Sequence, residues 1–225
     1  ETLPRYFTAD LARSIRTDRG PAAVIAANNV IANIDVLDDV MDGIRTILAP
    51  DGVFVFETGY LLDMVQNSVF DNIYHEHISY HSVKPFETFF RRNGMELIHV
   101  DRVPTKGGSI RGTVQLAKGP RKISSTVPSL IKLETEHGLD RAETYKVFDA
   151  RLQEVKKNLL DMLKDLRGKG KTIAGYGASH SVTTLVHHFD LAPFLNFIVD
   201  DNPRKQNTFS PGHHIPVLMP QAIYE

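Results

Sequence analysis

The stretch AAVIAANNVIANIDVLDDVMDGIRTILAPDGVFVFETGY, residues 22–60, determines the fold class of this chain. It opens with an apolar run that ends in small polar side chains, a pattern typical of a strand buried on both faces. Apolar residues then recur at helical spacing over residues 35–48, and a Pro-Asp-Gly turn leads into a second apolar run, VFVFETGY. Strand, helix and strand in this order predict an α/β fold with a parallel sheet.

The rest of the chain extends this pattern in two parts. Residues 8–20 predict a helix that Thr8 caps, and residues 85–94 predict another. The runs MELIHVDRVP and SIRGTVQLA predict an antiparallel edge hairpin. A long amphipathic helix that ends at Gly168 then leads into the strand KTIAGYGAS, a helix, and the strand FLNFIVDD. We therefore expect one domain over residues 1–120 and a smaller α/β domain over residues 121–225.

The composition excludes several classes of function. The chain has 225 residues, a formal net charge of −1 and no cysteine, so disulfides, thiolate nucleophiles and cysteine-ligated zinc are ruled out. It has no long apolar run, no signal-peptide pattern and no block of like charge, so we expect a cytoplasmic protein without a membrane or nucleic-acid partner. Because the sequence begins without a Met or an opening strand, we also expect a fragment of a longer protein.

The densest group of reactive side chains is DNIYHEHISYHS, residues 71–82, which we call the base loop. It holds three histidines, a glutamate and two tyrosines. Adjacent residues rarely surround one tetrahedral ion, so we expect no metal. A histidine beside a carboxylate and a tyrosine suits proton transfer, because imidazole titrates near neutrality and the carboxylate fixes its tautomer. The alternative is a polar loop that caps a helix.

Two other stretches offer groups that hold a ligand. Asn28, Asn29 and Asn33 follow the first predicted strand, where α/β proteins bind ligands, although they would equally cap the strand end. In TKGGSIRG, residues 105–112, Gly107 and Gly108 let the backbone approach a ligand while Lys106 and Arg111 are available to a phosphate. The same glycines also fit a plain hairpin turn.

The motif GYGAS, residues 175–179, lies between a predicted strand and a predicted helix. Backbone amides around Gly175 and Gly177 would then face a phosphate, and Asp200 or Asp201 follows the next strand as a ribose-binding acid would. The third glycine of the dinucleotide fingerprint is missing, since His180 stands there. Nucleotide contact, NAD binding and a tight turn without a ligand all stay open.

Four stretches in order carry a resemblance that covers nearly the whole chain: AANNVIANID, APDGVFVFETGYLLDMVQNSVFDNIYHEHISYHS, RVPTKGGSIRG, and GYGAS with VDDNPRKQ and SPGHHIPV. They resemble the sugar C-methyltransferases that use S-adenosylmethionine to methylate a ring carbon of nucleotide-linked keto-deoxysugars. The resemblance implies the C-terminal half of a class I methyltransferase domain, residues 1–120, followed by a Rossmann-like domain. It also implies an upstream zinc domain and the cofactor as S-adenosylmethionine.

The family's base motif, Tyr-x-Glu-His, falls on Tyr74, Glu76 and His77. The resemblance implies that His77 removes the proton alpha to the sugar ketone, that Glu76 orients His77, and that Tyr74 hydrogen-bonds the substrate. Asn28 and Asn29 would contact the cofactor. The substrate, an NDP-sugar, would be held by a larger set: Asn33, Lys106, Gly107, Gly108, Gly175 and Gly177.

The chain departs from the family in two ways. Asn33 stands where the family commonly has a histidine, and an amide cannot act as an acid or base at neutral pH. The glycine-rich cofactor loop and the acidic residue of the first half-domain are not in this sequence, so we expect the chain by itself to be inactive. The alternatives to the methyltransferase are an NAD-linked oxidoreductase and a non-catalytic module that binds a nucleotide sugar.

Overall fold

The computed structural model describes residues 1–225, and the chain forms two compact units. The first unit comprises Glu1–Val69 and Glu76–Tyr145, and the second comprises Phe70–His75 and Lys146–Glu225. Each unit combines helices with a four-stranded sheet, so the predicted α/β fold class is confirmed. None of the helices combines the length and the apolar character that crossing a membrane requires.

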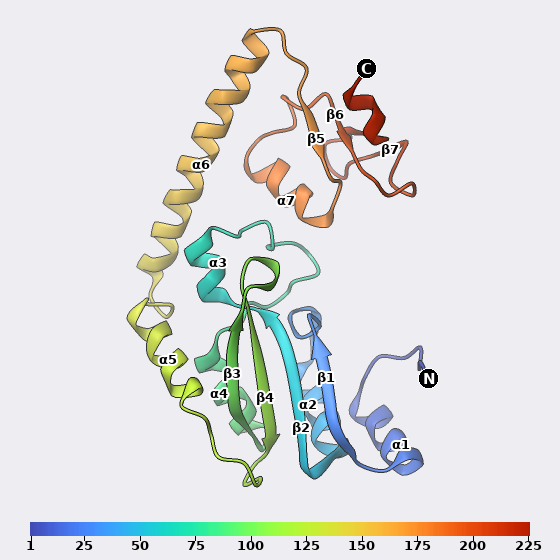
Figure 1. The fold of residues 1–225 in the computed structure, drawn as a ribbon, viewed down its shortest axis with the longest axis vertical. Coiled ribbons are helices and arrows are strands. Elements are labelled where there is room, and N and C mark those ends of the chain that lie inside the picture. The colour runs from blue at the N-terminus through green and yellow to red at the C-terminus, as the bar shows by residue number, and fades with distance from the viewer. The chain divides into compact units, whose positions relative to one another are not determined.

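The first unit is built on a sheet with the strand order β1-β2-β4-β3 (Figure 1). Strands β1 and β2 are parallel, while β4 runs antiparallel to both of its neighbours, β2 and β3. The elements are α1 (Ala9–Arg19), β1 (Ala22–Asn28), η1 (Ile31–Asn33), α2 (Leu37–Ile47), β2 (Leu48–Gly59), α3 (Leu61–Asn67), α4 (Val83–Arg92), β3 (Met95–Val103), η2 (Thr105–Gly107), β4 (Ser109–Leu116) and α5 (Thr126–Glu136).

The expected strand, helix and strand over residues 22–60 are present as β1, α2 and β2, and the expected antiparallel hairpin is present as β3 and β4. Thr8 caps α1 as predicted, since its hydroxyl accepts the amide of Leu11 at 3.2 Å. However, β4 is a central strand, because it also pairs with β2. The sequence patterns gave no signal for α3 or α5.

The prediction that the first strand is buried on both faces is wrong. Strand β1 pairs only with β2, so one edge of it is open in this chain, and Val24 is 63% exposed. The same apolar run that marks a central strand therefore stands at an edge here. Strand β2 has a neighbour on each side, and its Phe54 and Phe56 are fully buried. The Phe56 ring packs at 4.9 Å from Phe86 of α4, and these contacts fix α4 on the sheet.

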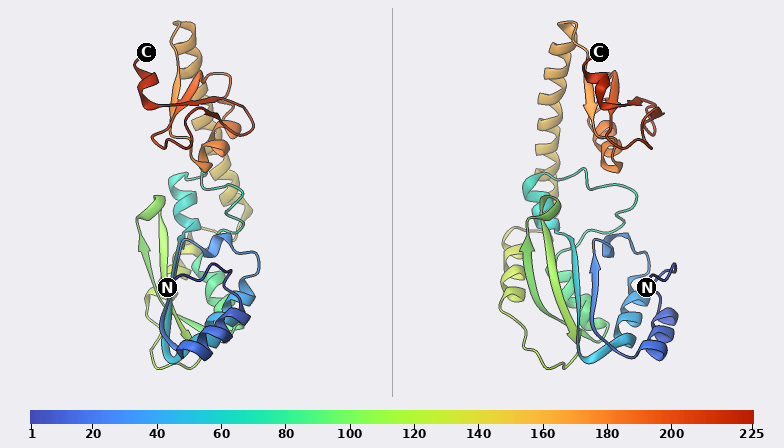
Figure 2. Two further views of the ribbon diagram at one scale, coloured as in Figure 1. Left: turned by 90° about the vertical axis from the view of Figure 1, so that its right-hand side faces the viewer. Right: turned by 45° about the vertical axis from the view of Figure 1, so that its right-hand side comes forward.

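The first unit extends beyond residue 120, because α5 packs on β3 and α4. Val127 of α5 is buried in the core of the first sheet. The helices α1 and α2 also lie side by side, as both views of Figure 2 show. The domain boundary at residues 120 and 121 stays a prediction, since a compact unit in space and a domain in sequence need not coincide.

The long predicted helix is α6 (Ala142–Gly168), which starts in the first unit and continues into the second. The second unit contains a smaller sheet of order β5-β6-β8-β7, in which β5, β6 and β8 are parallel and β7 is antiparallel to β8. Its elements are β5 (Ala174–Tyr176), α7 (His180–His188), β6 (Phe197–Val199), β7 (Thr208–Phe209), β8 (Pro216–Leu218) and η3 (Pro220–Ile223).

Candidate functional site

The carboxyl end of β1 carries the three predicted asparagines. The backbone turns sharply there: Asn29 has a φ of 54°, and its amide donates to the carbonyl of Glu57 at the end of β2 at 2.7 Å. Asn28 and Asn33 are exposed, and Asn29 is half-buried. The structure thus places uncharged hydrogen-bonding groups at the carboxyl end of two parallel strands, the usual place for a ligand in α/β proteins.

The base loop is fastened beside this strand end. The amides of Ile78 and Ser79 donate to the carbonyl of Ala32 in η1, at 2.9 and 3.3 Å. His77 directly precedes Ile78, and Asn33 directly follows Ala32, so these hydrogen bonds bring the proposed base and Asn33 to the same end of the sheet. His77 is half-buried and Glu76 is exposed, which leaves both side chains accessible to a solute.

Tyr74 belongs to the short segment that packs with the second unit. Its ring lies 6.1 Å from that of His180, with 29° between the ring planes. The same segment is held by Phe70, whose ring stacks on Phe189 at 4.9 Å, and by Thr184, whose hydroxyl donates to the carbonyl of Ile73 at 2.7 Å. The motif Tyr-x-Glu-His is therefore divided, with Tyr74 in the second unit and Glu76 and His77 in the first.

His81 is a residue of the site that the sequence patterns did not single out. Its ring stacks on Phe86 at 4.4 Å with an interplanar angle of 17°, and its Nε2 lies 3.0 Å from the hydroxyl of Ser79. Burial lowers the pKa of His81 to about 4, although a hydrogen bond with the backbone of Ile31 opposes this shift. The ring is therefore neutral at physiological pH. The sequence feature that could have pointed to His81 is its position two residues before the helix that contains Phe86.

The neutral, half-buried ring of His81 predicts a stability that depends on pH. Its pKa falls from an ordinary 6.5 to about 4 on folding, so the unfolded chain binds the extra proton first. The contribution is complete above pH 6.5 and declines as the pH falls toward 4, by at most about 3 kcal/mol at 1.36 kcal/mol per unit. We measure the free energy of unfolding with urea between pH 7 and 4.5. For His81→Phe we expect it to lack this decline with falling pH.

The matched control for this measurement is His137→Gln, because His137 is exposed at the end of α5. This variant should keep the pH dependence of the parent chain. If the free energy of unfolding fell equally between pH 6.5 and 4.5 in His81→Phe and in the parent chain, the conclusion that folding keeps the His81 ring neutral would be disproved.

An ion pair between a buried carboxylate and a half-exposed arginine lies at the end of β2. Glu57 is 7% exposed and accepts two hydrogen bonds from Arg111, at 2.8 and 3.1 Å, and one from the hydroxyl of Thr105 at 2.8 Å. The bonds from Arg111, and then from Thr105, hold the pKa of Glu57 below its ordinary value. The guanidinium of Arg111 is bound to Glu57, which disfavours the expectation that Arg111 is available to a phosphate. Lys106 is exposed.

The glycines of TKGGSIRG are explained by packing within the first unit. A Cβ on Gly108, whose φ is 129°, would lie 2.2 Å from the Cβ of Asp63, and Asp63 itself pairs with Arg102. A Cβ on Gly107 would lie 3.0 Å from Val69. A hairpin turn without a ligand is thus enough to explain why glycine stands at both positions. A contact of Lys106, Gly107 and Gly108 with substrate remains a prediction.

In the second unit, the GYGAS motif forms the turn from β5 to α7, with Gly177 at a φ of 94°. The carboxylate of Asp200 holds this turn: it accepts the amides of Ala178 at 2.7 Å and Asn202 at 2.8 Å, and pairs with Lys205 at 3.2 Å. The amides of Asn202 and Ala178 hold its pKa below the ordinary value. Asp200 is therefore occupied within the fold, which disfavours it as a ribose-binding acid.

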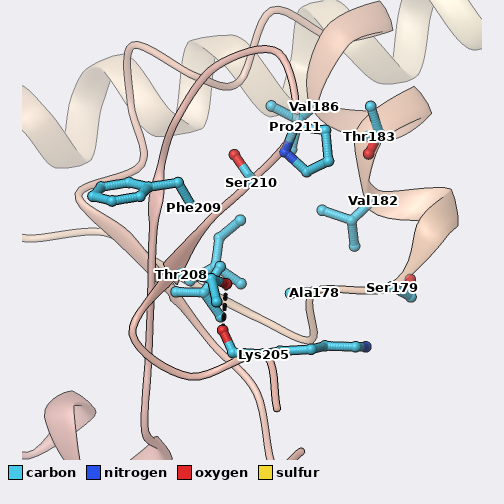
Figure 3. A pocket seen from close by; sticks show the side chains of 12 residues that line it. Ala178, Ser179, Val182, Thr183, Val186, Lys205, Thr208, Phe209, Ser210 and Pro211 are labelled. Atoms are coloured by element: carbon cyan, nitrogen blue, oxygen red, sulfur yellow. Dashed lines mark hydrogen bonds between the residues drawn. The ribbon is translucent and has the colours of Figure 1, made fainter.

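A small cavity of about 200 Å³ opens beside the same turn. Figure 3 shows Val182 and Thr183 of α7 on one side of it and Thr208 and Phe209 of β7 on the other. Most of its wall is apolar, and Gly175 and Gly177 do not line it. No group of three His, Asp or Glu side chains in the structure is placed to hold a metal ion.

Comparisons with known proteins cover both units. Residues 104–225 match the family described as C-methyltransferase C-terminal domain, and residues 5–100 match the family described as Methyltransferase domain. The chain is 31% identical over 222 residues to the C-methyltransferase NovU of Streptomyces niveus. This alignment covers 98% of the chain and 53% of NovU, so the chain spans about half the length of this curated relative.

Among solved structures, a SAM-dependent methyltransferase from Anabaena variabilis is 13% identical, with a TM-score of 0.38 over 49% of this chain and 55% of that chain. An O-methyltransferase family protein from Burkholderia thailandensis is 14% identical, with a TM-score of 0.38 over 52% of this chain and 36% of that chain.

Proposed function

The chain belongs to the C-methyltransferase family, and on this basis we propose that the natural protein containing it methylates a ring carbon of a nucleotide-linked keto-deoxysugar. The methyl donor is S-adenosylmethionine, and the acceptor carbon lies alpha to the sugar ketone. The observation that carries the proposal is the pair of hydrogen bonds from Ile78 and Ser79 to Ala32. They hold the backbone next to His77 beside the strand end that carries the asparagines, which supports the assignment of His77 and the asparagines to one site.

The residues at this strand end fit the methionine part of the donor. Asn28 is exposed and Asn29 is half-buried, and neither side chain carries a charge that would oppose the positive sulfonium. When bound, S-adenosylmethionine supplies a methyl group on a positively charged sulfur that leaves as a neutral thioether. Asn28 and Asn29 would orient the amino-acid end of the donor by hydrogen bonds, and alignment of this kind is a large part of catalysis between two substrates.

His77 is the proposed base. It takes the proton from the carbon alpha to the ketone, and the electron pair of the broken C–H bond forms the enolate, whose carbon then bonds to the methyl group. Glu76 is adjacent in the chain and would stabilise the imidazolium that forms. From the motif alone, we assign to Tyr74 the role of donating a hydrogen bond to the enolate oxygen. Asn33 would hydrogen-bond the sugar, and Lys106 with the glycines Gly107, Gly108, Gly175 and Gly177 would meet the diphosphate.

The test is methyl transfer by the natural protein from labelled S-adenosylmethionine to an NDP-4-keto-deoxysugar. We expect the label in the sugar, on the carbon next to the ketone. NAD binding by calorimetry, together with no label transfer, would favour the oxidoreductase. Binding of the nucleotide sugar without transfer would favour the non-catalytic module, for which Asn33 is the motivating residue.

A further inference from the structure

Ser79 and His81 follow the proposed base by two and four residues. The base loop has no helix or strand of its own apart from a single bridge between His81 and Tyr60. Backbone hydrogen bonds fasten it at two points: Ile78 and Ser79 to Ala32, and the carbonyl of His81 to the amide of Leu61 at 2.9 Å. These backbone hydrogen bonds help to set the position of the segment that carries His77.

The side chains of Ser79 and His81 add a further contact to this segment. Nε2 of His81 lies 3.0 Å from Oγ of Ser79, and the ring also hydrogen-bonds the backbone of Ile31. Ile31 directly precedes Ala32, which receives the two amides of the base loop. The ring cannot swing away, since it stacks on Phe86, which is 3% exposed in the core. One imidazole thus joins the base loop, η1 and α4.

The two partners of the ring, Ile31 and Ser79, favour one tautomer. A backbone carbonyl only accepts hydrogen bonds, so the ring nitrogen that bonds Ile31 carries a proton. Both partners of the ring are accounted for when this nitrogen is Nδ1 and when Nε2 accepts from the hydroxyl of Ser79. Burial keeps the pKa of His81 at about 4, so this neutral arrangement persists through the physiological range.

We propose that Ser79 and His81 form a positioning pair for the base: His81 is held as the Nδ1–H tautomer between Ile31 and the Ser79 hydroxyl, and this arrangement sets the place of His77 relative to Asn33. The catalytic part of this proposal rests on the proposed function. A general base must lie within hydrogen-bond reach of the proton that it removes, and a displacement of about 1 Å can lower the rate by about 10²-fold. Neither residue of the pair needs to touch the substrate.

The first test needs no substrate. Long-range proton–nitrogen NMR spectra of the protein at pH 7, assigned with His81→Phe, should show His81 as the Nδ1–H tautomer. Ser79→Ala should increase the amide exchange rates at positions 78 and 79 by about tenfold, which is the effect of losing one hydrogen bond of ordinary strength. Ser79→Thr retains the hydroxyl and should restore slow exchange. An Nε2–H tautomer, or a ring that is charged at pH 7, overturns the pair.

The second test measures the exchange of the sugar's alpha hydrogen with D2O by the natural protein. For Ser79→Ala we expect kcat to fall about tenfold with KM within about twofold, and for Ser79→Thr we expect recovery. Unchanged kcat in Ser79→Ala overturns the positioning role alone. If the parent protein exchanges no hydrogen from the keto-sugar, the proposed function is overturned and the catalytic role of the pair falls with it, whatever the NMR spectrum shows.

Discussion

His77→Gln is expected to lower methyl transfer by a factor of about 10² to 10⁴, the usual contribution of a positioned general base. Glutamine keeps a polar side chain of similar reach but cannot accept a proton at neutral pH. The amides of Ile78 and Ser79 fasten the base loop to the carbonyl of Ala32, and the substitution leaves both amides in place. The rate is measured as label transferred from S-adenosylmethionine to the keto-sugar.

The same variant should also lose the exchange of the alpha hydrogen with D2O, because both processes begin with the same proton abstraction. Asn28→Ala should behave differently: it should weaken methyl transfer, through the donor, but spare the exchange. His75→Gln is the matched control, since His75 is an exposed histidine two residues earlier in the same loop, and it should retain at least about half of the activity. Normal deuterium exchange by His77→Gln would show that another group is the base.

The parts of the fold that depend on local periodicity were predictable from the sequence. Apolar spacing and turn residues located β1, α2, β2, the hairpin of β3 and β4, and the long helix α6. The exposure of β1 was not predictable, because an apolar strand is read as buried whether or not a neighbour is present on both sides. Helix α5 was missed because its burial is set by contacts with β3 and α4, far away in the sequence.

The candidate site shows the same division. The motif containing Glu76 and His77 was visible as a dense group of side chains, and the asparagines could be placed at a strand end. Arg111 and Glu57 lie 54 positions apart in the sequence, so no local pattern predicts that they pair. His81 was treated as one more polar residue of the loop, since its neutral state depends on the burial of its ring, which stacks on Phe86.

Glu134→Ala should destabilise the first unit by about 3 to 5 kcal/mol, because three neutral hydrogen-bond donors lose their acceptor. Glu134 is 2% exposed, yet it makes no ion pair; its carboxylate accepts the Tyr60 hydroxyl at 3.0 Å, the Val83 amide at 2.6 Å and the Lys84 amide at 3.0 Å. Alanine would leave these three donors without an acceptor, and Tyr60 is fully buried. Each such donor costs about 1 to 3 kcal/mol.

The two amides are the first ones of α4, which has no side-chain cap from its own N-cap residue, Ser82. Glu134 therefore takes the place of the missing cap, and its negative charge interacts favourably with the positive end of the helix dipole. Glu134→Gln should cost less, about 1 to 2 kcal/mol, because its amide oxygen still accepts two of the bonds while its NH2 group meets a donor. Urea unfolding of the chain measures both losses.

The matched control is Glu136→Ala on the same helix. Glu136 is exposed and pairs with Lys132 at 3.6 Å, so its loss should cost less than about 0.5 kcal/mol. Glu134→Ala should also speed amide exchange at Val83 and Lys84 and, through the pairing of His81 with Tyr60 and Leu61, at the end of the base loop. A stability within about 1 kcal/mol of the parent chain would mean that water satisfies the three donors, and that Glu134 does not hold α4 and the base loop in place.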